Sequence, residues 1–336
     1  FSIYGMVGEM MKLDKILGVK YPIIQGGMAH ISDGKFAAKV SESGALGVIG
    51  SGSMTGEELR NEIRVCKSLT KKPFGVNLML LNPYVDEMAE IIIEEKVPVV
   101  TTGAGSPSKY IAKWHKANIK VFPVVPNPTL AMRMEKYGVD GVIVEGNEAG
   151  GHIGDMTSMT LIPQTKDKVN IPIIAAGGIA SGKQMLAAKV LGAVGVQIGT
   201  LFLSSSECPI HEEYKNLLIK SKYNNITVIG RITGLPMRLI KNNMTRNYIK
   251  EEKKGKDKME LEMYTLGALK TAVKSGDLKK GSFMAGLTVS QIEEIKPVGE
   301  ILEGLMKQYM EELDRIYYEM EVEKGEYNMV KEYEGR

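Results

Sequence analysis

A single histidine flanked by glycines is the first candidate for chemistry in this sequence. His152 lies in the stretch "EGNEAGGHIGD" (residues 145–155), which continues the apolar run "GVIVEG". Gly150, Gly151 and Gly154 let the backbone pass close to a flat ligand, and His152 is then the main titratable side chain that reaches the ligand. Its ordinary pKa of about 6.5 suits proton transfer or hydrogen-bond donation at neutral pH. The alternative is a loop histidine that only satisfies a backbone carbonyl.

Two glycine-containing stretches have the composition of a phosphate site. They are "AAGGIASG", which carries Gly177 and Gly178, and "QIGT", which carries Gly199 and Thr200. Glycines let backbone N–H groups approach an anion closely, and the threonine hydroxyl adds another donor. We predict that both stretches bind one phosphate group. The alternative is that the glycines only form tight turns.

The elements that must position these residues follow a regular rhythm of short apolar runs and amphipathic stretches, which is typical of βα units. The eight runs begin at Tyr21, Ala45, Phe74, Val97, Lys120, Gly141, Ile171 and Ala193. Eight strands with a unit of about 22 to 30 residues favour an α/β fold of the (β/α)₈ TIM barrel type over a doubly wound sheet, which needs fewer strands. The ends of the runs then meet at the C-terminal face of the barrel, where such proteins build their sites.

Further small or polar residues lie at or just beyond the ends of the runs, on the same predicted rim. They are Gly26, Gly27, Met28, Asn77, Thr102, Glu145, Ala149, Gly150 and Gln197. The glycines allow close backbone approach, and the Asn77 amide can pair in both directions with a heterocyclic amide. A phosphate at the last two loops and a flat ring over the others make flavin mononucleotide (FMN) the leading ligand.

The alternation of apolar runs and amphipathic stretches ends after Leu203, and we predict that the chain has four parts. Residues 1–11 are an N-terminal extension or an expression remnant, residues 12–204 the FMN-binding barrel, residues 205–289 a small helical subdomain or lid, and residues 290–336 a C-terminal helix packed on the barrel. Residues 236–276 read as a basic set of helices. Its residues Arg238, Lys241, Arg246, Lys250, Lys253 and Lys254 either attract an acidic partner or form an ordinary solvated face.

Composition argues against several classes of protein. The chain has 336 residues, 43% of them hydrophobic, and a formal net charge of +3. This mild charge gives no argument for nucleic-acid binding, and no apolar run approaches the roughly 20 residues needed to span a bilayer. Cys66 and Cys208 lie far apart and lack zinc-type spacing, which fits a cytoplasmic protein without a disulfide framework or a structural zinc ion.

Longer motifs carry a resemblance to a known family. "YPIIQGGMAHISDG", "KKPFGVNLMLLNPYVDE", "VVTTGAGSPSKY", "IPIIAAGGIASG", "VQIGTLF" and "GSFMAGL" closely resemble the flavin-dependent enoyl-acyl-carrier-protein reductases of type II, the FabK family. The resemblance covers about residues 12 to 320. The nitronate monooxygenases, in the same broader group, share the barrel, the flavin and "GGH". The combination of "GVNLMLL", "PVVP" and "EGNEAGGHIG" favours the reductase.

The resemblance implies a reaction and a set of ligands. NADH, or NADPH, reduces FMN, which passes hydride to the β-carbon of a trans-2-enoyl thioester on acyl carrier protein during fatty-acid elongation. His152 matches the family's active-site histidine, which binds the thioester carbonyl and supports protonation at the α-carbon. Met284 and Gly286 match a turn that approaches the flavin. A homodimer is implied as well, together with activation by a monovalent cation whose ligands the sequence does not reveal.

Three alternatives compete with the reductase. In a nitronate monooxygenase, His152 would remove an α-proton and reduced flavin would meet oxygen. An enzyme like inosine-monophosphate dehydrogenase needs a nucleophilic cysteine on a glycine-rich loop, but Cys66 falls within a predicted helix and Cys208 beyond the barrel. A phosphate-binding module without catalysis is disfavoured, because an isolated titratable histidine on a barrel rim is more typical of an enzyme.

Overall fold

Eight parallel strands form a ring, which confirms the predicted TIM barrel. The computed structural model describes residues 11–334, with side chains described through residue 322, so residues 1–10 of the expected extension lie outside it. The sheet order is β1-β9-β8-β6-β5-β4-β3-β2, and a parallel bridge between Ile24 and Leu46 joins β1 to β2. The strands are β1 (Ile23–Gln25), β2 (Gly47–Gly50), β3 (Phe74–Met79), β4 (Val99–Gly103), β5 (Lys120–Val125), β6 (Val142–Glu145), β8 (Ile173–Ala176) and β9 (Gly195–Ile198).

Helices surround the ring, and several of them begin at residues whose side chains cap the helix. The helices are α2 (Leu13–Leu17), α3 (Gly34–Glu42), α4 (Gly56–Leu69), α5 (Val85–Glu94), α6 (Ser108–Lys116), α7 (Pro128–Lys136), α8 (Ser158–Lys166) and α9 (Gly182–Val190). The side chains of Thr55, Asn127 and Ser181 each accept a hydrogen bond from a backbone N–H in the first turn of the following helix. Such caps satisfy donors that the helix itself leaves unpaired, so the loops end at fixed points.

Two apolar layers hold the barrel together. Ile24, Val48, Phe122 and Ile174 belong to a fully buried cluster that includes Leu13 of α2. Because these strand residues alternate with those that face the outer helices, we place this cluster inside the ring, with α2 covering one end. The larger cluster fills the space between the sheet and the surrounding helices.

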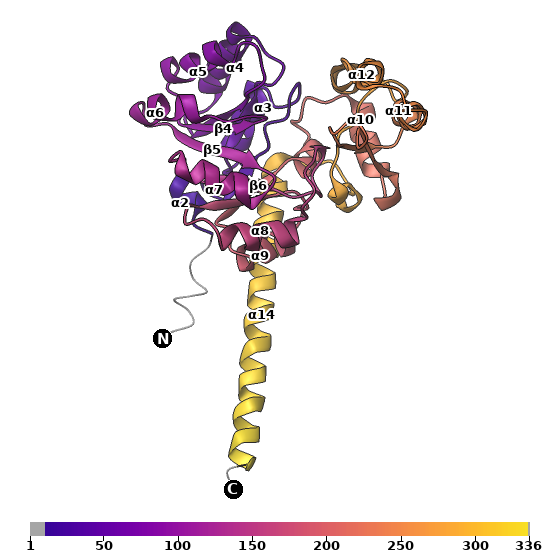
Figure 1. Ribbon diagram of the computed structural model, residues 1–336. Helices are drawn as coiled ribbons and strands as arrows, with labels where there is room; N and C mark the ends of the chain where they lie inside the picture. Colours follow the sequence, from indigo (N-terminus) through magenta and orange to yellow (C-terminus); the bar gives the residue numbers. More distant parts are fainter. Residues whose placement is uncertain (1–10, 335–336) are drawn as a thin grey trace.

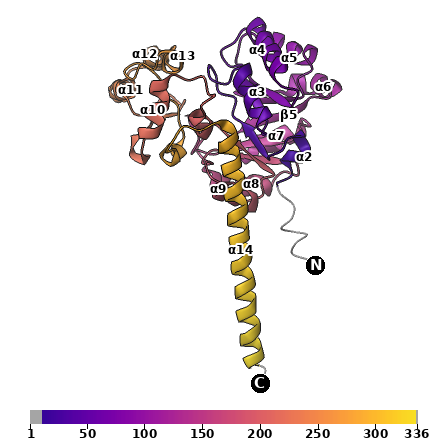
Figure 2. The same ribbon diagram turned by 180° about the vertical axis from the view of Figure 1, so that it is seen from behind.

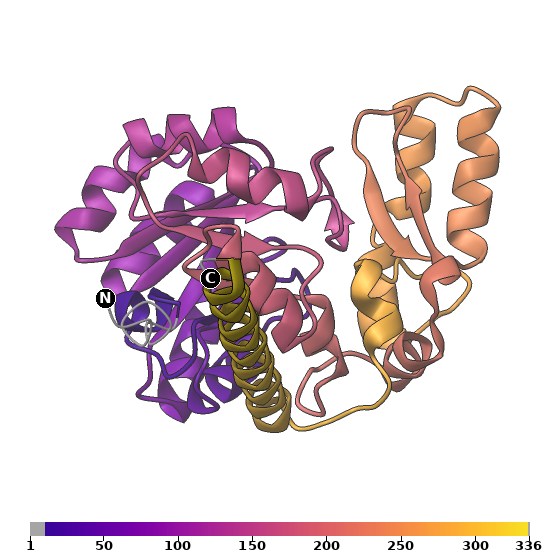
Figure 3. The same ribbon diagram turned by 90° about the horizontal axis from the view of Figure 1, so that it is seen from below.

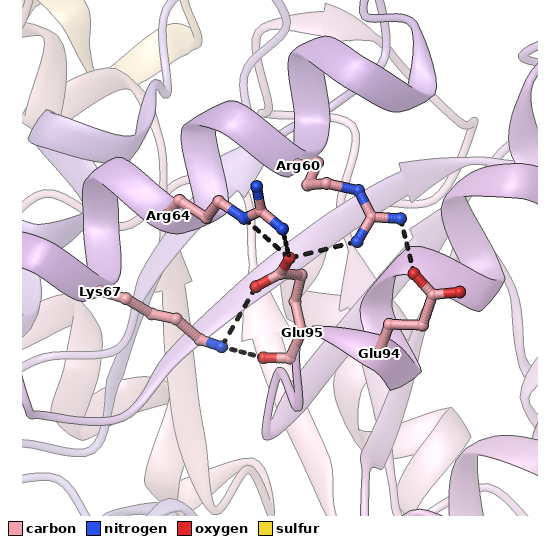
Figure 4. A network of polar contacts seen from close by, with 5 residues as sticks. All are labelled: Arg60, Arg64, Lys67, Glu94 and Glu95. Carbon is pink, nitrogen blue, oxygen red and sulfur yellow. Dashed lines mark hydrogen bonds and ion pairs between the residues drawn. The ribbon is translucent and has the colours of Figure 1, made fainter.

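Two of the outer helices are joined by a charged network (Figure 4). Arg60 and Arg64 of α4 contact the Glu95 carboxylate at 3.2 and 3.0 Å, and Arg60 also contacts Glu94 at 2.6 Å. Lys67 adds an ion pair with Glu95 at 3.5 Å. Burial alone would raise the pKa of the Glu95 carboxyl, but hydrogen bonds from Arg60 and Arg64 outweigh it and hold the pKa below its usual range. The network fastens α4 to the end of α5.

The subdomain that follows the barrel contains strands as well as helices. After β9 and the 3₁₀ segment η1 (Thr200–Ser204), it comprises the 3₁₀ segments η2 (Tyr223–Asn225) and η3 (Leu287–Gln291), helices α10 (Glu212–Lys220), α11 (Asn243–Lys253), α12 (Lys258–Thr265) and α13 (Ala268–Ser275), and strands β10 (Ile226–Ile229) and β11 (Met237–Ile240). Figures 1 and 3 show it beside the barrel. A third strand, β7 (Gly151–His152), comes from the barrel and completes the order β10-β11-β7.

The prediction of helix for residues 237–240 is therefore wrong. Met237 and Arg238 pair antiparallel with His152 and Gly151, and the same strand pairs with β10 on its other side. The prediction extended the helical pattern of the basic segment backwards into β11. The β-branched residues of Ile226–Ile229 favour a strand, and the prediction did not include this local signal.

A long helix ends the described chain. α14 (Val298–Glu334) lies within the segment 290–336 predicted as a C-terminal helix, begins eight residues later, and packs its first turns against α9. The contact is close, because a Cβ added to Gly182 of α9 would lie 2.1 Å from the backbone nitrogen of Tyr309. Figures 1 and 2 show the rest of α14 extending away from the barrel. Within residues 11–334, none of the helices is both long and apolar enough to cross a membrane.

Candidate active site

A cavity of about 600 Å³ lies at the C-terminal ends of the strands. Leu269 of α13 and Met284 line it together with barrel residues, so the subdomain forms part of its wall. The cavity brings together most of the predicted site residues: Gly26, Gly27, Met28, Asn77, Glu145, Ala149, Gly150, His152, Gly177, Gly178, Gln197, Gly199, Thr200 and Met284. Residues from distant parts of the chain thus converge on one space, as the barrel geometry predicted.

Two predicted residues lie behind the cavity wall. Thr102 is 1% exposed and does not line the cavity. Its neighbour Thr101 instead accepts a hydrogen bond from Asn77 Nδ2 at 2.8 Å and so orients the amide that does line it. Gly286 also lies outside the lining, but its N–H donates to Thr200 Oγ1 at 2.9 Å. That bond leaves the Thr200 hydroxyl hydrogen free to donate to a ligand.

The two predicted phosphate loops are neighbours, because β8 and β9 pair directly. Gly177 and Gly178 have φ angles of +85° and +78°, which a residue with a side chain adopts only at a cost. Gly199 and Thr200 follow β9 on the adjacent strand. Backbone from both loops therefore faces the same end of the cavity, the arrangement expected of a phosphate site.

Other residues of the cavity lining fit a flat ring with an amide edge. Gln197 Oε1 is buried and has no hydrogen-bond partner among the described residues, so it is an acceptor available for a ligand N–H. A Cβ added to Gly27 would lie 2.2 Å from Asn77 Cβ, so only glycine lets this loop pass over the amide. A free acceptor, an oriented amide and bare backbone are the features that an isoalloxazine ring would use. The residues present fit FMN.

His152 stands on β7, at the border between barrel and subdomain. Its side chain is exposed to the cavity, and the surrounding protein removes enough water to lower the pKa of the imidazole below 6.5. The ring is therefore neutral at about pH 7, with one N–H to donate and one nitrogen to accept. A neutral imidazole can donate a hydrogen bond to a carbonyl or remove a proton from carbon.

Glu145 ends β6 and lines the cavity, and desolvation raises the pKa of its carboxyl to about 7. Burial disfavours the charged form, so between the unfolded pKa and about 7 the folded state binds more protons than the unfolded state. Stability should therefore fall as pH rises through that window.

We expect Glu145→Gln to remove this pH dependence. From pH 5 to pH 8, the free energy of unfolding of the flavin-free variant should rise by about 1 to 2 kcal/mol relative to that of the flavin-free wild type. This is less than the full pKa shift would give, because the carboxyl contacts water in the cavity. Urea unfolding at both pH values, followed by far-UV circular dichroism, measures the gap between the two proteins. A gap that stays constant with pH would contradict the assignment.

Glu148 is a cavity residue that the sequence analysis missed. Its carboxylate accepts hydrogen bonds from Ser158 N at 2.9 and 3.0 Å and from Ser158 Oγ at 3.1 Å, at the start of α8. It also lines a smaller cavity of about 360 Å³ that shares Gly177 and Gly178. The residue lies within the stretch already singled out around His152, but only its contact with α8 reveals that it supports the loop. Among the described residues, no group of three or more His, Cys, Asp or Glu side chains could hold a metal ion.

Comparison with solved structures identifies a similar fold. FabK from Thermotoga maritima is 42% identical, with a TM-score of 0.89, and the match covers 92% of this chain and 99% of that one. It agrees with the barrel and the adjoining subdomain described above.

Comparison with curated proteins gives other names. A "Probable nitronate monooxygenase" from Staphylococcus saprophyticus is 36% identical over 68% of this chain and 77% of its own length. A Rhodococcus jostii protein named "(3aS,4S,5R,7aS)-5-hydroxy-7a-methyl-1-oxo-octahydro-1H-indene-4-carboxyl-CoA dehydrogenase" is 32% identical over 70% of this chain and 67% of its own. A family model described as Nitronate monooxygenase matches residues 10–92 and 85–308. The chain therefore belongs to the nitronate monooxygenase family of flavin-dependent oxidoreductases.

Proposed function

We propose that this protein is an FMN-containing enoyl-acyl-carrier-protein reductase that uses NADH or NADPH and acts in bacterial type II fatty-acid elongation. The observation that carries the proposal is the 42% identity to Thermotoga maritima FabK over 92% of the chain. The nitronate monooxygenase relative is 36% identical over 68%. The homodimer and the activating monovalent cation implied by the resemblance belong to the same proposal, together with the cytoplasmic location inferred from the two cysteines.

In this proposal two groups of residues in the cavity lining have separate tasks. The loops at Gly178 and at Gly199–Thr200 hold the phosphate, while Gln197 and Asn77 contact the ring edge. When bound, FMN supplies hydride transfer from the nicotinamide to the β-carbon of the enoyl thioester. No protein side chain is needed to carry those electrons.

His152 acts on the substrate. As hydride reaches the β-carbon, negative charge develops on the thioester oxygen, and the neutral imidazole donates its N–H to that atom. The interaction is stronger at the transition state than in the ground state, so it accelerates the reaction instead of only tightening binding. His152 also supports delivery of a proton to the α-carbon, which completes the reduction.

The second candidate is nitronate monooxygenase, favoured by the family model and by the curated relative from Staphylococcus saprophyticus. There the lowered pKa of His152 would keep the imidazole neutral and able to remove the α-proton of the substrate. Two assays separate the candidates. The reductase should be bleached anaerobically by NADH and reoxidised by crotonyl thioester, whereas the monooxygenase should consume oxygen with an alkyl nitronate. If the protein consumes oxygen with an alkyl nitronate and crotonyl thioester does not reoxidise its reduced flavin, the reductase proposal is overturned.

The basic surface of α11 is a candidate docking site for acyl carrier protein. Arg246, Lys250, Lys253 and Lys254 are exposed on or just after α11, whereas Arg238 is buried on β11 and does not belong to this surface. Attraction between exposed charges steers association and weakens with salt.

We expect Arg246→Glu with Lys250→Glu to raise KM for carrier-bound enoyl substrate by about tenfold at low salt, because charge repulsion replaces attraction. KM for crotonyl-coenzyme A should change less than twofold. Lys71→Glu with Lys72→Glu makes the same charge change just before β3, at the other end of the barrel, and serves as the control. Equal effects on both substrates, or equal effects of the control, would contradict docking at α11.

A further inference from the structure

The strand that carries His152 is hydrogen-bonded into the sheet of the subdomain. β7 pairs antiparallel with β11, so that Met237 lies opposite His152 and Arg238 opposite Gly151. Beyond the pairing, Ile153 N donates to Pro236 O at 3.1 Å. The backbone of the proposed catalytic residue is thus held by the subdomain, although the chain reaches it directly from β6 of the barrel.

Arg238 makes a second connection between the same two parts. Its side chain is 5% exposed, and its guanidinium donates to three oxygens of the loop between β6 and β7. Nη1 donates to Ala149 O at 3.0 Å and to Asn147 O, and Nη2 donates to Asn147 Oδ1 at 3.0 Å. A planar guanidinium can hold several acceptors in one fixed arrangement, which an ammonium group cannot do.

Asn147 passes this restraint across the loop. Its backbone N–H donates to Met156 O at 2.7 Å, and its side-chain Nδ2 donates to Gly154 O. Both bonds cross from the first arm of the loop to the second, and His152 lies between the two arms. Fixing Asn147 therefore fixes the loop on both sides of the histidine.

A buried guanidinium is costly unless it is well paired. Among the described residues, no carboxylate lies within ion-pair distance of Arg238, and its Nε has no hydrogen-bond partner. Only carbonyl oxygens replace the water that the Arg238 guanidinium loses on burial. An apolar residue would fill the same space at lower cost, so the arginine is better explained by what it holds than by the stability it adds.

We propose that Arg238 is a positioning residue, which sets the place of His152 over the cavity by tying Asn147 and Ala149 to the subdomain. The effect of this clamp on turnover rests on the proposed function, because it assumes that His152 acts on the substrate. The effect of the clamp on His152 itself does not rest on that assumption.

The kinetic experiment uses the flavin-loaded protein and compares the two half-reactions. Arg238→Met should keep anaerobic reduction by NADH within about twofold of the wild type and should lower the rate of reoxidation by crotonyl thioester by about 10- to 100-fold, because small misplacement of a reacting group costs up to about 10²-fold. KM for the thioester should change little. Arg238→Lys retains the charge but not the fork and should be intermediate. Arg133→Met, at an exposed arginine of α7 on the outside of the barrel, is the matched control and should behave as the wild type.

A second readout does not depend on turnover. The chain has four histidines, so the imidazole NMR signals can be assigned by comparison with His152→Gln. In Arg238→Met the pKa of His152 should rise towards about 6.5, because a loosened loop admits water. The imidazole signals of His115 on α6 and of His211 before α10 serve as internal references.

The outcomes decide separate questions. If Arg238→Met lowers the melting temperature while the His152 pKa and the reoxidation rate stay at their wild-type values, Arg238 is only structural and the proposal is overturned. If Arg238→Met does not fold, Asn147→Ala removes one acceptor of the same clamp and should shift both readouts in the same direction; an unchanged His152 pKa there overturns the proposal too. If wild-type protein fails to reduce enoyl thioesters, the proposed function fails, and the NMR titration still decides the clamp.

Discussion

His152→Ala is expected to accept electrons from NADH at nearly the wild-type rate and to pass them to crotonyl thioester about 10²- to 10⁴-fold more slowly, the usual cost of losing one positioned donor or general acid. Hydride transfer from the nicotinamide needs stacking against the ring and no protein proton donor. Reduction of the thioester needs the developing charge on its oxygen to be stabilised, and His152 is the titratable side chain exposed at that part of the cavity.

Stopped-flow absorbance of the two half-reactions measures this difference. His152→Gln retains a hydrogen-bond donor without the imidazole and should give an intermediate rate of reoxidation. His115→Ala, on the outer helix α6, is the matched histidine control and should leave both half-reactions unchanged. If His152→Ala loses both half-reactions in equal proportion while keeping its FMN, the histidine serves nicotinamide binding or loop structure instead.

Gly178→Asp is expected to purify with most of its flavin missing. Gly178 has a φ of +78°, and an added Cβ would lie 3.3 Å from Glu148 Cβ, so the new carboxylate would share a small space with Glu148 and the phosphate. Repulsion of this kind is worth about 2 to 4 kcal/mol at an intermediate dielectric, which raises the Kd for FMN by about 30- to 1000-fold. The measurement is the flavin-to-protein absorbance ratio, followed by titration of the apoprotein with FMN.

Two controls separate charge from backbone strain. Gly178→Asn has nearly the same size without the charge and should lose much less FMN affinity. Gly138→Asp places aspartate at another glycine with positive φ, +82°, where an added Cβ meets nothing within 4 Å. It should cost some stability and keep its flavin. A folded Gly178→Asp variant with full flavin content would show that the phosphate binds elsewhere.

Much of the barrel could be predicted because its signals are local. Each apolar run ends where the chain turns, and parallel strands bring those ends to one face, so the sequence alone places Gly178, Gly199 and His152 together. The sequence is less informative at Thr102. Successive residues of a strand face opposite sides, and the sequence of β4 does not reveal that both Thr101 and Thr102 are buried and lie outside the cavity lining.

The role of Arg238 could not be predicted, because it depends on contacts between distant parts of the chain. It stands at the start of a segment rich in Lys and Arg, and that segment reads as an exposed charged surface. Its hydrogen bonds reach Asn147, 91 positions earlier, and exist only because β7 leaves the barrel to pair with β11. Sequence patterns reflect local structure, so they do not reveal that β7 and β11 pair across so many residues.

The shared sheet also limits how this protein can be recombined with its relatives. Gly150 packs so closely on the turn at Ala285 and Gly286 that an added Cβ would lie 2.6 Å from the Ala285 carbonyl carbon, and β7 gives β11 its second neighbour. A chimera that exchanged residues 205–289 alone would pair a foreign β11 with the native β7. A working chimera therefore has to exchange the loop of residues 146–156 together with the subdomain. These two segments are separate in the gene, but they form one structural unit in the protein.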